Sequence, residues 1–260
     1  MLLRSLGTGV TGLKNFQTYL DVVGNNIANV STTGFKKGRI NFEDVFSSNL
    51  QGATQNKNAI QVGLGSESSS IDNILTGGTV NSTGNPYDLA INGEGYFQVT
   101  DGNNTYYTRA GDFKLNSEGN GLVNSQGMTL SITGAVDSFA DVSSFTVNDS
   151  GHITGVRTDN GAAANLGNIN LYVFSNPAGL EKAGNSLYQQ TTGSGNATLV
   201  TADNGLGSST KIQQNALEGS NVDLTDEMTA LIEAQRAYQA NARTITTADQ
   251  ILQELVQLKR

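Results

Sequence analysis

An apolar residue stands at every seventh position between Asn221 and Leu258, and neither Gly nor Pro interrupts this stretch, although the chain of 260 residues holds 31 Gly. A repeat of about 3.5 residues is typical of a helix whose buried stripe faces another helix, because ideal turns of about 3.6 residues drift off such a stripe. The first apolar series reads Leu224, Leu231, Tyr238, Ile245 and Leu252, and a second series reads Met228, Gln235, Ala242, Asp249 and Val256. The pattern predicts one long coiled-coil helix, which Asp223 or Thr225 can cap.

The start of the chain carries a stripe of similar pitch. Its apolar residues alternate spacings of three and four and read Leu3, Leu6, Val10, Leu13, Phe16, Leu20, Val23 and Ile27. This spacing predicts a second amphipathic helix from about Leu3 to Asn29. A long helix with one narrow apolar stripe cannot bury that stripe on itself. We therefore expect the two ends of the chain to pair antiparallel, with the middle as a folded excursion between them.

The predicted helices carry more apolar residues than one seam can cover, with Ile232, Ile251 and Leu258 among the surplus. A self-sufficient hairpin in a monomer is one interpretation, and packing between subunits is the other. Exposed apolar area of this kind normally marks an interface, so we expect assembly with other copies of the chain. The residues expected to pack between subunits are Leu6, Val10, Leu13, Phe16, Leu20, Val23, Ile27, Leu224, Met228, Leu231, Tyr238, Ile245, Leu252, Leu255 and Val256.

The middle of the chain has the period of β-strands. Leu89-Ala90-Ile91, a Gly-rich turn and Tyr96-Phe97-Gln98-Val99 predict two strands, and similar short runs follow up to Phe174. Short strands at close spacing indicate an antiparallel sandwich or barrel. The expected fold class is α+β. Its expected domains are a helical assembly domain of residues 1–35 with 219–260, an extended linking arm of residues 36–70 that becomes ordered against a neighbour, and a β-rich outer domain of residues 71–218.

Composition excludes several classes of function. The chain has no Cys, which excludes disulfides and thiolate zinc sites. A net charge of -8 argues against a nucleic-acid partner, because phosphate binding needs a basic face. No apolar run approaches the ~18 residues of a membrane span, so membrane insertion is not expected. Carboxylates are scattered singly, and we expect no catalytic site, metal or cofactor.

Two motifs have chemical interpretations that their context does not support. Gly7, Gly9 and Gly12 match G-x-G-x-x-G, but a dinucleotide fingerprint must follow a strand, and this one stands too near the start of the chain. We expect these glycines to let helices approach closely. His152 is the single histidine in the sequence, and catalysis or metal binding needs partners of the right type. We expect a surface residue.

Short motifs at both ends and in the middle resemble those of one protein family. At the ends they read Asn25-Asn26-Ile27-Ala28-Asn29, Thr33-Gly34-Phe35-Lys36, Ser220-Asn221-Val222-Asp223-Leu224 and Ala234-Gln235-Arg236-Ala237-Tyr238. In the middle they read Asp88-Leu89-Ala90-Ile91, Gly95-Tyr96-Phe97 and Tyr107-Thr108-Arg109-Ala110-Gly111. Together they resemble the rod and hook proteins of the bacterial flagellum, over nearly the whole chain.

The resemblance implies a subunit of a helical tube, with the paired ends lining a central export channel and the β domain outside. It also implies export through the flagellar export apparatus, a location in the hook or basal body outside the cell, and rod, hook-cap and hook-filament junction proteins as partners. The residues that carry the family motif are Asn25, Asn26, Ala28, Asn29, Gly34, Phe35, Asn221, Gln235 and Arg236.

Within this family the ends of the chain favour one member. Asn221-Val222-Asp223-Leu224-Thr225 and the run from Gln250 to Val256 look closer to hook proteins, whereas the chain length is nearer to the distal rod protein. We expect a hook subunit, a flexible joint that transmits torque, with a distal rod subunit as the alternative. A β-rich surface adhesin is the alternative from another functional class.

Overall fold

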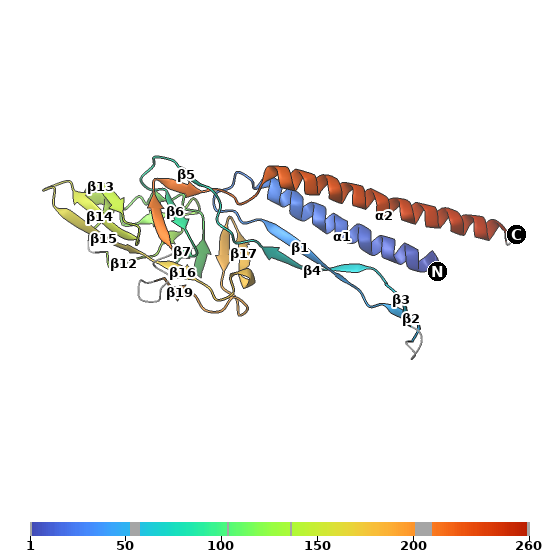
Figure 1. Ribbon diagram of the computed structural model, residues 1–260. Helices are drawn as coiled ribbons and strands as arrows, with labels where there is room; N and C mark the ends of the chain where they lie inside the picture. Colours follow the sequence, from blue (N-terminus) through green and yellow to red (C-terminus); the bar gives the residue numbers. More distant parts are fainter. Residues whose placement is uncertain (1, 53–57, 103, 136, 201–209, 259–260) are drawn as a thin grey trace. The chain divides into compact units, whose positions relative to one another are not determined.

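The computed structural model describes residues 2–52, 58–102, 104–135, 137–200 and 210–258, and it has the α+β fold that the sequence predicts (Figure 1). The chain divides into two compact units. The helical unit contains the residues up to Ala28, Gly38–Ile74 and the residues from Val222 on, and the β unit contains Asn29–Lys37 and Leu75–Asn221. The two chain ends therefore share a unit, as expected. The segment 29–37 groups with the strands, and the segment expected to be a separate arm groups mainly with the helices.

Helices α1 (Leu2–Ala28) and α2 (Leu224–Leu258) pack side by side in the helical unit, with the N- and C-terminal ends of the chain at the same end of the pair (Figure 1). A Cβ atom on Gly9 would lie 3.0 Å from Ile245 Cγ1, and one on Gly12 would lie 3.0 Å from Asn241 Nδ2. Asn26, near the end of α1, contacts Glu227 near the start of α2. The pairing is therefore antiparallel, as the sequence predicts, and two of the three motif glycines permit close approach.

The start of α2 is capped by a side chain. Asp223 Oδ1 accepts hydrogen bonds from the backbone N–H of Thr225 at 2.8 Å and of Asp226 at 3.4 Å. A carboxylate at this position satisfies donors that the first turn leaves free and complements the helix dipole. Of the two cap residues that the sequence offers, the structure uses Asp223.

The seam between the helices is built from smaller residues than the heptad series indicates. On α2 the buried positions are Glu227, Ala234 and Ala248, with Asn241 half-buried at the same spacing of seven. This series lies one residue before the predicted series of Met228 and its followers. One residue turns a helix by about 100°, and four residues by about 40° beyond a full turn. The Met228 series and the Leu224 series therefore both lie on one flank of the seam. Small side chains stand at the line of contact because Gly9 and Gly12 of α1 bring the helices close.

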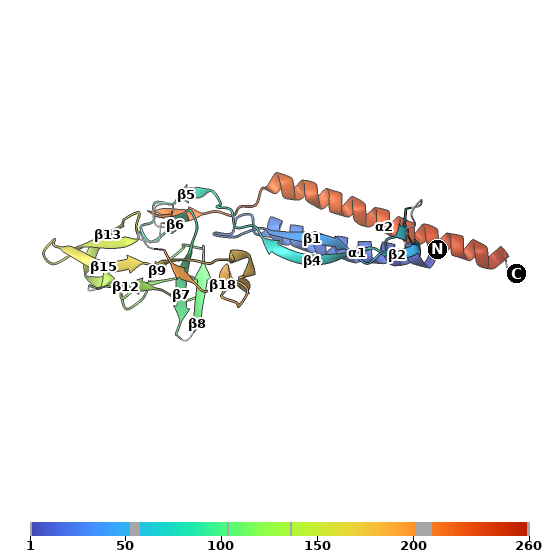
Figure 2. The same cartoon turned by 60° about the horizontal axis from the view of Figure 1, so that its bottom comes forward.

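The segment after α1 forms a hairpin with its own hydrogen-bonded ladder (Figure 2). Strand β1 (Gly38–Asp44) pairs with β4 (Ser66–Asn73), and β2 (Ser48–Gln51) pairs with β3 (Ile60–Val62), both antiparallel. Asn15 Nδ2 of α1 donates to Ser66 Oγ at 2.8 Å, and the Phe42 ring lies 6.2 Å from that of Phe16. The sequence predicts an extended arm ordered by a neighbour, but its backbone pairs with itself and rests on α1. The sequence of β4 reads Ser-Glu-Ser-Ser-Ser-Ile-Asp-Asn, so this strand has no apolar alternation that would have shown the ladder.

In the described part of the β unit, the larger sheet runs in the order β17-β18-β8-β7-β11-β10-β9, with β16 pairing with β7 and β19. A smaller sheet runs in the order β12-β15-β14-β13, and β20 pairs with β6 and β21 with β5. All these pairs are antiparallel, as predicted. The first half of the unit contains β5 (Val80–Ser82), β6 (Leu89–Asn92), β7 (Tyr96–Asp101), β8 (Asn104–Thr108), β9 (Lys114–Leu115), β10 (Leu122–Val123), β11 (Thr129–Leu130) and β12 (Ile132–Thr133). The second half contains the 3-10 helices η1 (Phe139–Asp141) and η2 (Pro177–Gly179) and the strands β13 (Val142–Val147), β14 (His152–Arg157), β15 (Ala163–Ile169), β16 (Leu171–Val173), β17 (Glu181–Gly184), β18 (Leu187–Gln189), β19 (Thr198–Leu199), β20 (Lys211–Gln214) and β21 (Ala216–Glu218).

Two clusters form the core of the β unit. The larger one is aliphatic with two phenylalanines in edge contact, Phe97 and Phe113, whose ring centroids lie 5.4 Å apart. The smaller one is aromatic and consists of Tyr96, Tyr107, Phe174, Leu180 and Tyr188. Strand β20 pairs with β6, and β21 pairs with β5. Residues just before α2 are therefore joined to strands that begin far earlier in the chain.

Alkaline pH should destabilise the β unit through the aromatic cluster. Burial raises the pKa of Tyr96 from 10.0 to about 12, with Arg109 opposing the shift and Glu218 adding to it, and burial also raises the pKa of Tyr188. With a raised pKa in the folded state, the unfolded chain loses its protons first. Stability that is present below pH 10.0 is therefore lost as the pH rises toward about 12. At ~1.4 kcal/mol per pKa unit, Tyr96 accounts for about 3 kcal/mol of this loss.

Urea unfolding followed by far-ultraviolet circular dichroism at a series of pH values measures this loss, because this signal does not depend on the ionisation of tyrosine. Tyr96→Phe should flatten the alkaline fall in the free energy of unfolding, because phenylalanine has no proton to release. Tyr238→Phe on α2 is the control and should leave the curve of the β unit unchanged. Coincident curves for Tyr96→Phe and the wild type would contradict the prediction.

Candidate assembly surfaces and the buried ion cluster

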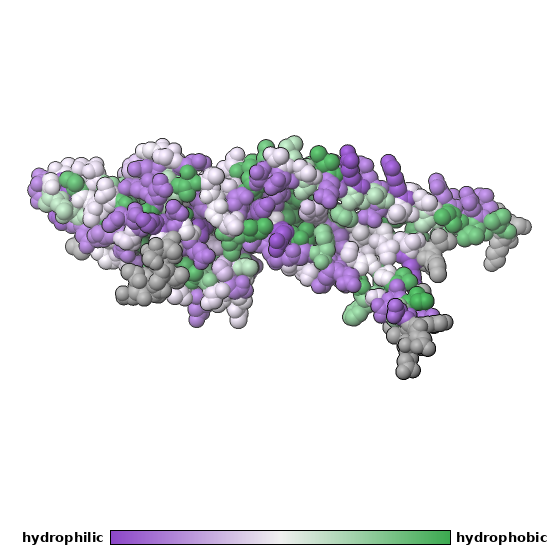
Figure 3. Space-filling model, viewed as in Figure 1, coloured by the Kyte–Doolittle hydropathy of each residue, from purple (hydrophilic) through white to green (hydrophobic). Residues whose placement is uncertain are grey.

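Helix α1 leaves a set of apolar side chains on α2 exposed, which we call the α2 exposed set. Its members are Leu224, Met228, Ile232, Tyr238, Ile251, Leu255, Val256 and Leu258. Figure 3 shows hydrophobic side chains interrupting the polar surface toward the C-terminal end of α2. A shallow groove there is lined by Asp249, Leu252, Gln253, Val256 and Gln257. This surface has the apolar character and the length of a helix-packing site.

The other residues expected to pack between subunits lie nearer the seam. On α1, Val23 is buried, Val10 is exposed, and the half-buried members are Leu6, Leu13, Phe16, Leu20 and Ile27. On α2, the half-buried members are Leu231, Ile245 and Leu252. The predicted set thus divides between the intrachain seam, its flanks and the fully exposed flank of α2.

A second apolar surface lies on the hairpin and has no signal in the heptads. Phe46 is 89% exposed, and Ile60, Val62 and Leu64 are also exposed. The sequence analysis describes residues 36–70 as an extended arm and names no apolar surface there. These residues lie in a segment that has no helical period. A repeat of 3.5 residues therefore gives no signal for them.

Asn26 of the family motif ties three parts of the helical unit together. Its Nδ2 donates to Glu227 Oε2 at 3.1 Å and to Gly38 O at 2.9 Å, and its Oδ1 accepts from Gly38 N at 2.9 Å. The side chains of Asn26 and Glu227 are both buried, so these hydrogen bonds are shielded from water. Asn26 therefore joins the end of α1, the start of α2 and the start of β1.

The remaining motif residues of the ends serve different roles. Asn29 is half-buried and its Oδ1 accepts from Thr32 Oγ1 at 3.0 Å in the turn after α1. The exposed members are Asn25, Ala28, Gln235 and Arg236. These side chains lie at the surface of the helical unit, in contrast to Asn26.

A cluster of buried ions lies inside the β unit, where residues of the second motif meet strand β21. Lys36 Nζ lies 2.6 Å from Glu218 Oε1, and Arg109 Nη1 lies 3.3 Å from Glu218 Oε2. Lys36 is 0% exposed, Glu218 1% and Arg109 4%. One carboxylate thus pairs with two cations away from water. Burial lowers the pKa of Lys36, and the hydrogen bond and charge of Glu218 oppose that shift.

Backbone groups also bind these ions. Lys36 Nζ donates to Thr76 O at 2.8 Å, Gly78 N donates to Glu218 Oε1 at 2.9 Å, and Arg109 Nη2 donates to Gly93 O at 2.9 Å. The Arg109 guanidinium also lies over the Tyr96 ring, 5.3 Å from its centroid. Lys36 stands in a motif that the sequence analysis quotes, but Glu218 was missed because nothing adjacent to it in the sequence signals a buried ion.

Gly34 and Phe35 fit the segment onto the strands. Gly34 has φ +66, and a Cβ atom there would lie 2.6 Å from the backbone N of Ala110. Lys182 Nζ lies over the Phe35 ring, 5.1 Å from its centroid. Only glycine combines the left-handed backbone with this close approach.

Gly34→Ala should lower the free energy of unfolding of the β unit by about 2 to 4 kcal/mol, because it adds left-handed strain and a clash with backbone atoms. Gly84→Ala is the matched control, since Gly84 has φ +72 but meets nothing within 4 Å. Thermal unfolding of the two variants separates the destabilisation caused by left-handed backbone strain from that caused by the clash with Ala110. Equal losses in both would show that the approach to Ala110 is not limiting.

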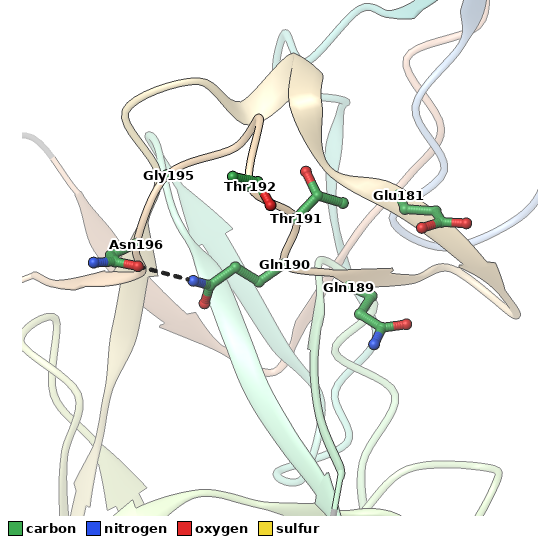
Figure 4. A pocket seen from close by; sticks show the side chains of 7 residues that line it. All are labelled: Glu181, Gln189, Gln190, Thr191, Thr192, Gly195 and Asn196. Atoms are coloured by element: carbon green, nitrogen blue, oxygen red, sulfur yellow. Dashed lines mark hydrogen bonds between the residues drawn. The ribbon is translucent and has the colours of Figure 1, made fainter.

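The β unit also has an open polar pocket between β17, β18 and the loop that follows (Figure 4). Its lining consists of Glu181, Gln189, Gln190, Thr191, Thr192, Gly195 and Asn196, and Gln190 Nε2 donates to Asn196 Oδ1 at 3.2 Å. One carboxylate among amides and hydroxyls does not make the pair of carboxyl groups that glycoside hydrolysis needs.

His152 lies exposed on β14. Among the described residues, neither helix is long and apolar enough to cross a membrane.

Family models match both ends of the chain and its middle. The model described as Flagella basal body rod protein matches residues 6–36, that of the Flagellar hook protein FlgE/F/G D1 domain matches residues 90–155, and that of the Flagellar basal body rod FlgEFG protein C-terminal matches residues 213–258. The matched segments contain α1 with the second motif, most of the larger sheet, and β21 with α2.

Relatives of similar length carry the name of a rod protein. The chain is 44% identical to the flagellar basal-body rod protein FlgG of Bacillus subtilis over 100% of both chains. It is 38% identical to that of Agrobacterium fabrum over 96% of this chain and 97% of the relative. The flagellar hook protein FlgE of Borreliella burgdorferi is 27% identical over 99% of this chain and 100% of the relative, in an alignment that extends over 444 residues.

These comparisons favour the rod alternative over the hook subunit that the motifs near Asn221 and Gln250 indicated. The hook relative needs an alignment of 444 residues, whereas the Bacillus rod relative aligns over 269. They also replace the surface adhesin as an interpretation. The chain belongs to the bacterial flagellar rod and hook protein family, and it is a structural subunit of the flagellum and not an enzyme.

Proposed function

We propose that the chain is a rod subunit of the flagellar basal body, and that it polymerises into a helical tube through its terminal helices. Rod proteins of several bacteria match it from end to end, which supports the choice of rod over hook. In this role the helical unit of each copy packs against the helical units of its neighbours. The β unit is the outer part of the tube.

The α2 exposed set is the observation that carries the proposal. Burying an apolar side chain fully contributes roughly 1.5 to 3 kcal/mol, so covering these side chains with neighbouring helices supplies a large association energy. Ordering a helix costs about 1 to 2 kcal/mol per residue in backbone entropy. With a seam of Ala, Gly and one Glu inside the chain, the helix pair gains much of its stability only on assembly. A free subunit therefore stays unpolymerised until copies accumulate.

The axial neighbours of a rod subunit follow from this role. We propose other rod proteins and the hook as neighbours, and the flagellar export apparatus as the route by which the subunit leaves the cell. Hook-cap and hook-filament junction proteins belong to the hook interpretation. They are partners only if the chain forms the hook.

Truncation tests the assembly role. A chain without residues 1–30 and 220–260 should be a soluble, folded monomer, while the full chain forms tubes visible by negative-stain electron microscopy. Tubes of the truncated chain would place the assembly contacts in the β unit and overturn the proposal.

Immunogold labelling distinguishes rod from hook. An antibody against the β unit should label detergent-extracted basal structures below the curved hook, along the straight rod. An antibody against the hook protein of the same cells is the control. Labelling of the hook itself by the first antibody would restore the hook interpretation.

A further inference from the structure

The β unit holds together the two chain segments from which α1 and α2 extend. The chain passes between the units after Ala28, Lys37, Ile74 and Asn221. Inside the β unit, Gly34 N donates to Glu218 O at 2.8 Å, Asn221 N donates to Phe35 O at 3.4 Å, and Lys37 N donates to Asn221 Oδ1 at 2.8 Å. We call residues 34–37 and 218–221, joined by these bonds, the root clamp.

Side chains of the root clamp also fix the crossing near Ile74. Lys36 Nζ bonds both Glu218 Oε1 and Thr76 O, and Asn221 Nδ2 lies 3.2 Å from Thr76 O and from Thr76 Oγ1. The buried ions are thereby placed at the roots of the helices and the hairpin. A structural ion pair with only a stability role has no need of this position.

We propose that the root clamp is a template for pairing α1 with α2. This inference rests on the proposed assembly through the helix pair. Helix α1 ends at Ala28 and α2 begins at Leu224, so without the clamp their pairing must close a loop of the 195 residues between them. Loop closure costs entropy that grows with loop length. Segments held a few ångströms apart instead meet at an effective concentration in the millimolar range or above.

The first contact beyond the clamp is already in place in the helical unit. Asn26 and Glu227, near the facing ends of α1 and α2, share the buried hydrogen bond of 3.1 Å. Pairing of the helices that starts at this hydrogen bond can extend along the Ala and Gly seam toward the chain ends. The clamp therefore gives assembly a helix pair that is registered from its root.

The test uses the full chain with Asn221→Ala, which removes the side-chain hydrogen bonds of Asn221 and leaves the buried ions in place. Lys36→Met is the second variant, since its near-equal length keeps the packing. Asp149→Asn, at an exposed pair with Lys211, is the control. Hydrogen exchange of the Gly34 amide reports the clamp, circular dichroism reports helix content, and pelleting reports the critical concentration for tubes.

Both clamp variants should expose the Gly34 amide, lower the helix content of the free subunit, and raise the critical concentration about tenfold or more, because Asn221→Ala removes three side-chain hydrogen bonds and Lys36→Met removes two. Amides of β7 and β8 should stay protected, and the control should match the wild type. An exposed Gly34 amide with unchanged helix content and critical concentration would overturn the template. If the wild type makes no tubes, the proposed function fails, and helix content still decides the template.

Discussion

Glu218→Gln is expected to lower the free energy of unfolding of the β unit by about 3 to 5 kcal/mol, because removing one partner of a buried ion pair leaves charge without compensation. Lys36 and Arg109 are both buried beside this carboxylate, so the substitution leaves two cations facing a neutral amide. Urea unfolding followed by tyrosine fluorescence measures the loss.

Two further variants show whether the loss comes from unbalanced charge. Lys36→Met combined with Glu218→Gln removes one of the two cations and should recover part of the stability, since apolar replacements of buried ions are often neutral. Asp149→Asn removes an exposed ion pair and should change the free energy of unfolding by less than about 1 kcal/mol. A loss below about 1 kcal/mol for Glu218→Gln alone would contradict the proposed balance of charges.

Polar substitutions in the α2 exposed set should raise the critical concentration for tubes by about a hundredfold or more. Met228→Gln, Leu255→Gln and Val256→Gln together remove apolar surface that is at least half exposed in the free chain. If assembly buries it, each loses roughly 1 kcal/mol or more of the burial free energy, and each 1.4 kcal/mol is about tenfold.

A pelleting assay over a range of subunit concentrations measures this change. The matched control changes exposed polar residues of the same helix, Glu233→Gln, Gln239→Asn and Glu254→Gln. Circular dichroism of each variant checks that helix content in the free subunit is kept. Equal critical concentrations for the two triple variants would show that the exposed apolar side chains do not drive assembly.

The helices and their antiparallel pairing could be predicted because their signal is local and periodic. The line of contact could not, because hydrophobicity gives little weight to Ala234 and Ala248 and none to Glu227. Gly9 and Gly12 bring the helix axes close beside Ile245 and Asn241, and Asn26 covers Glu227, so the line of contact is a property of two segments at once. The same limit hid the hairpin, because its strand β4 is almost entirely polar and is defined by the strand it pairs with.

The buried ion cluster shows what sequence reasoning lacks at longer range. Lys36 and Glu218 are 182 positions apart in the chain, and Arg109 is 109 positions from Glu218. No spacing rule connects such residues, and each alone resembles an ordinary surface charge. The choice between hook and rod rested on the ends of the chain, which both proteins use, and the comparisons favour the rod alternative.

A side-chain-resolution reconstruction of the assembled tube by electron cryomicroscopy tests the central claim most directly. It should show the terminal helices of each copy on the inner wall, with Met228, Leu255 and Val256 covered by helices of neighbouring copies. A tube held together by its β units, with these three side chains facing water, would contradict the account.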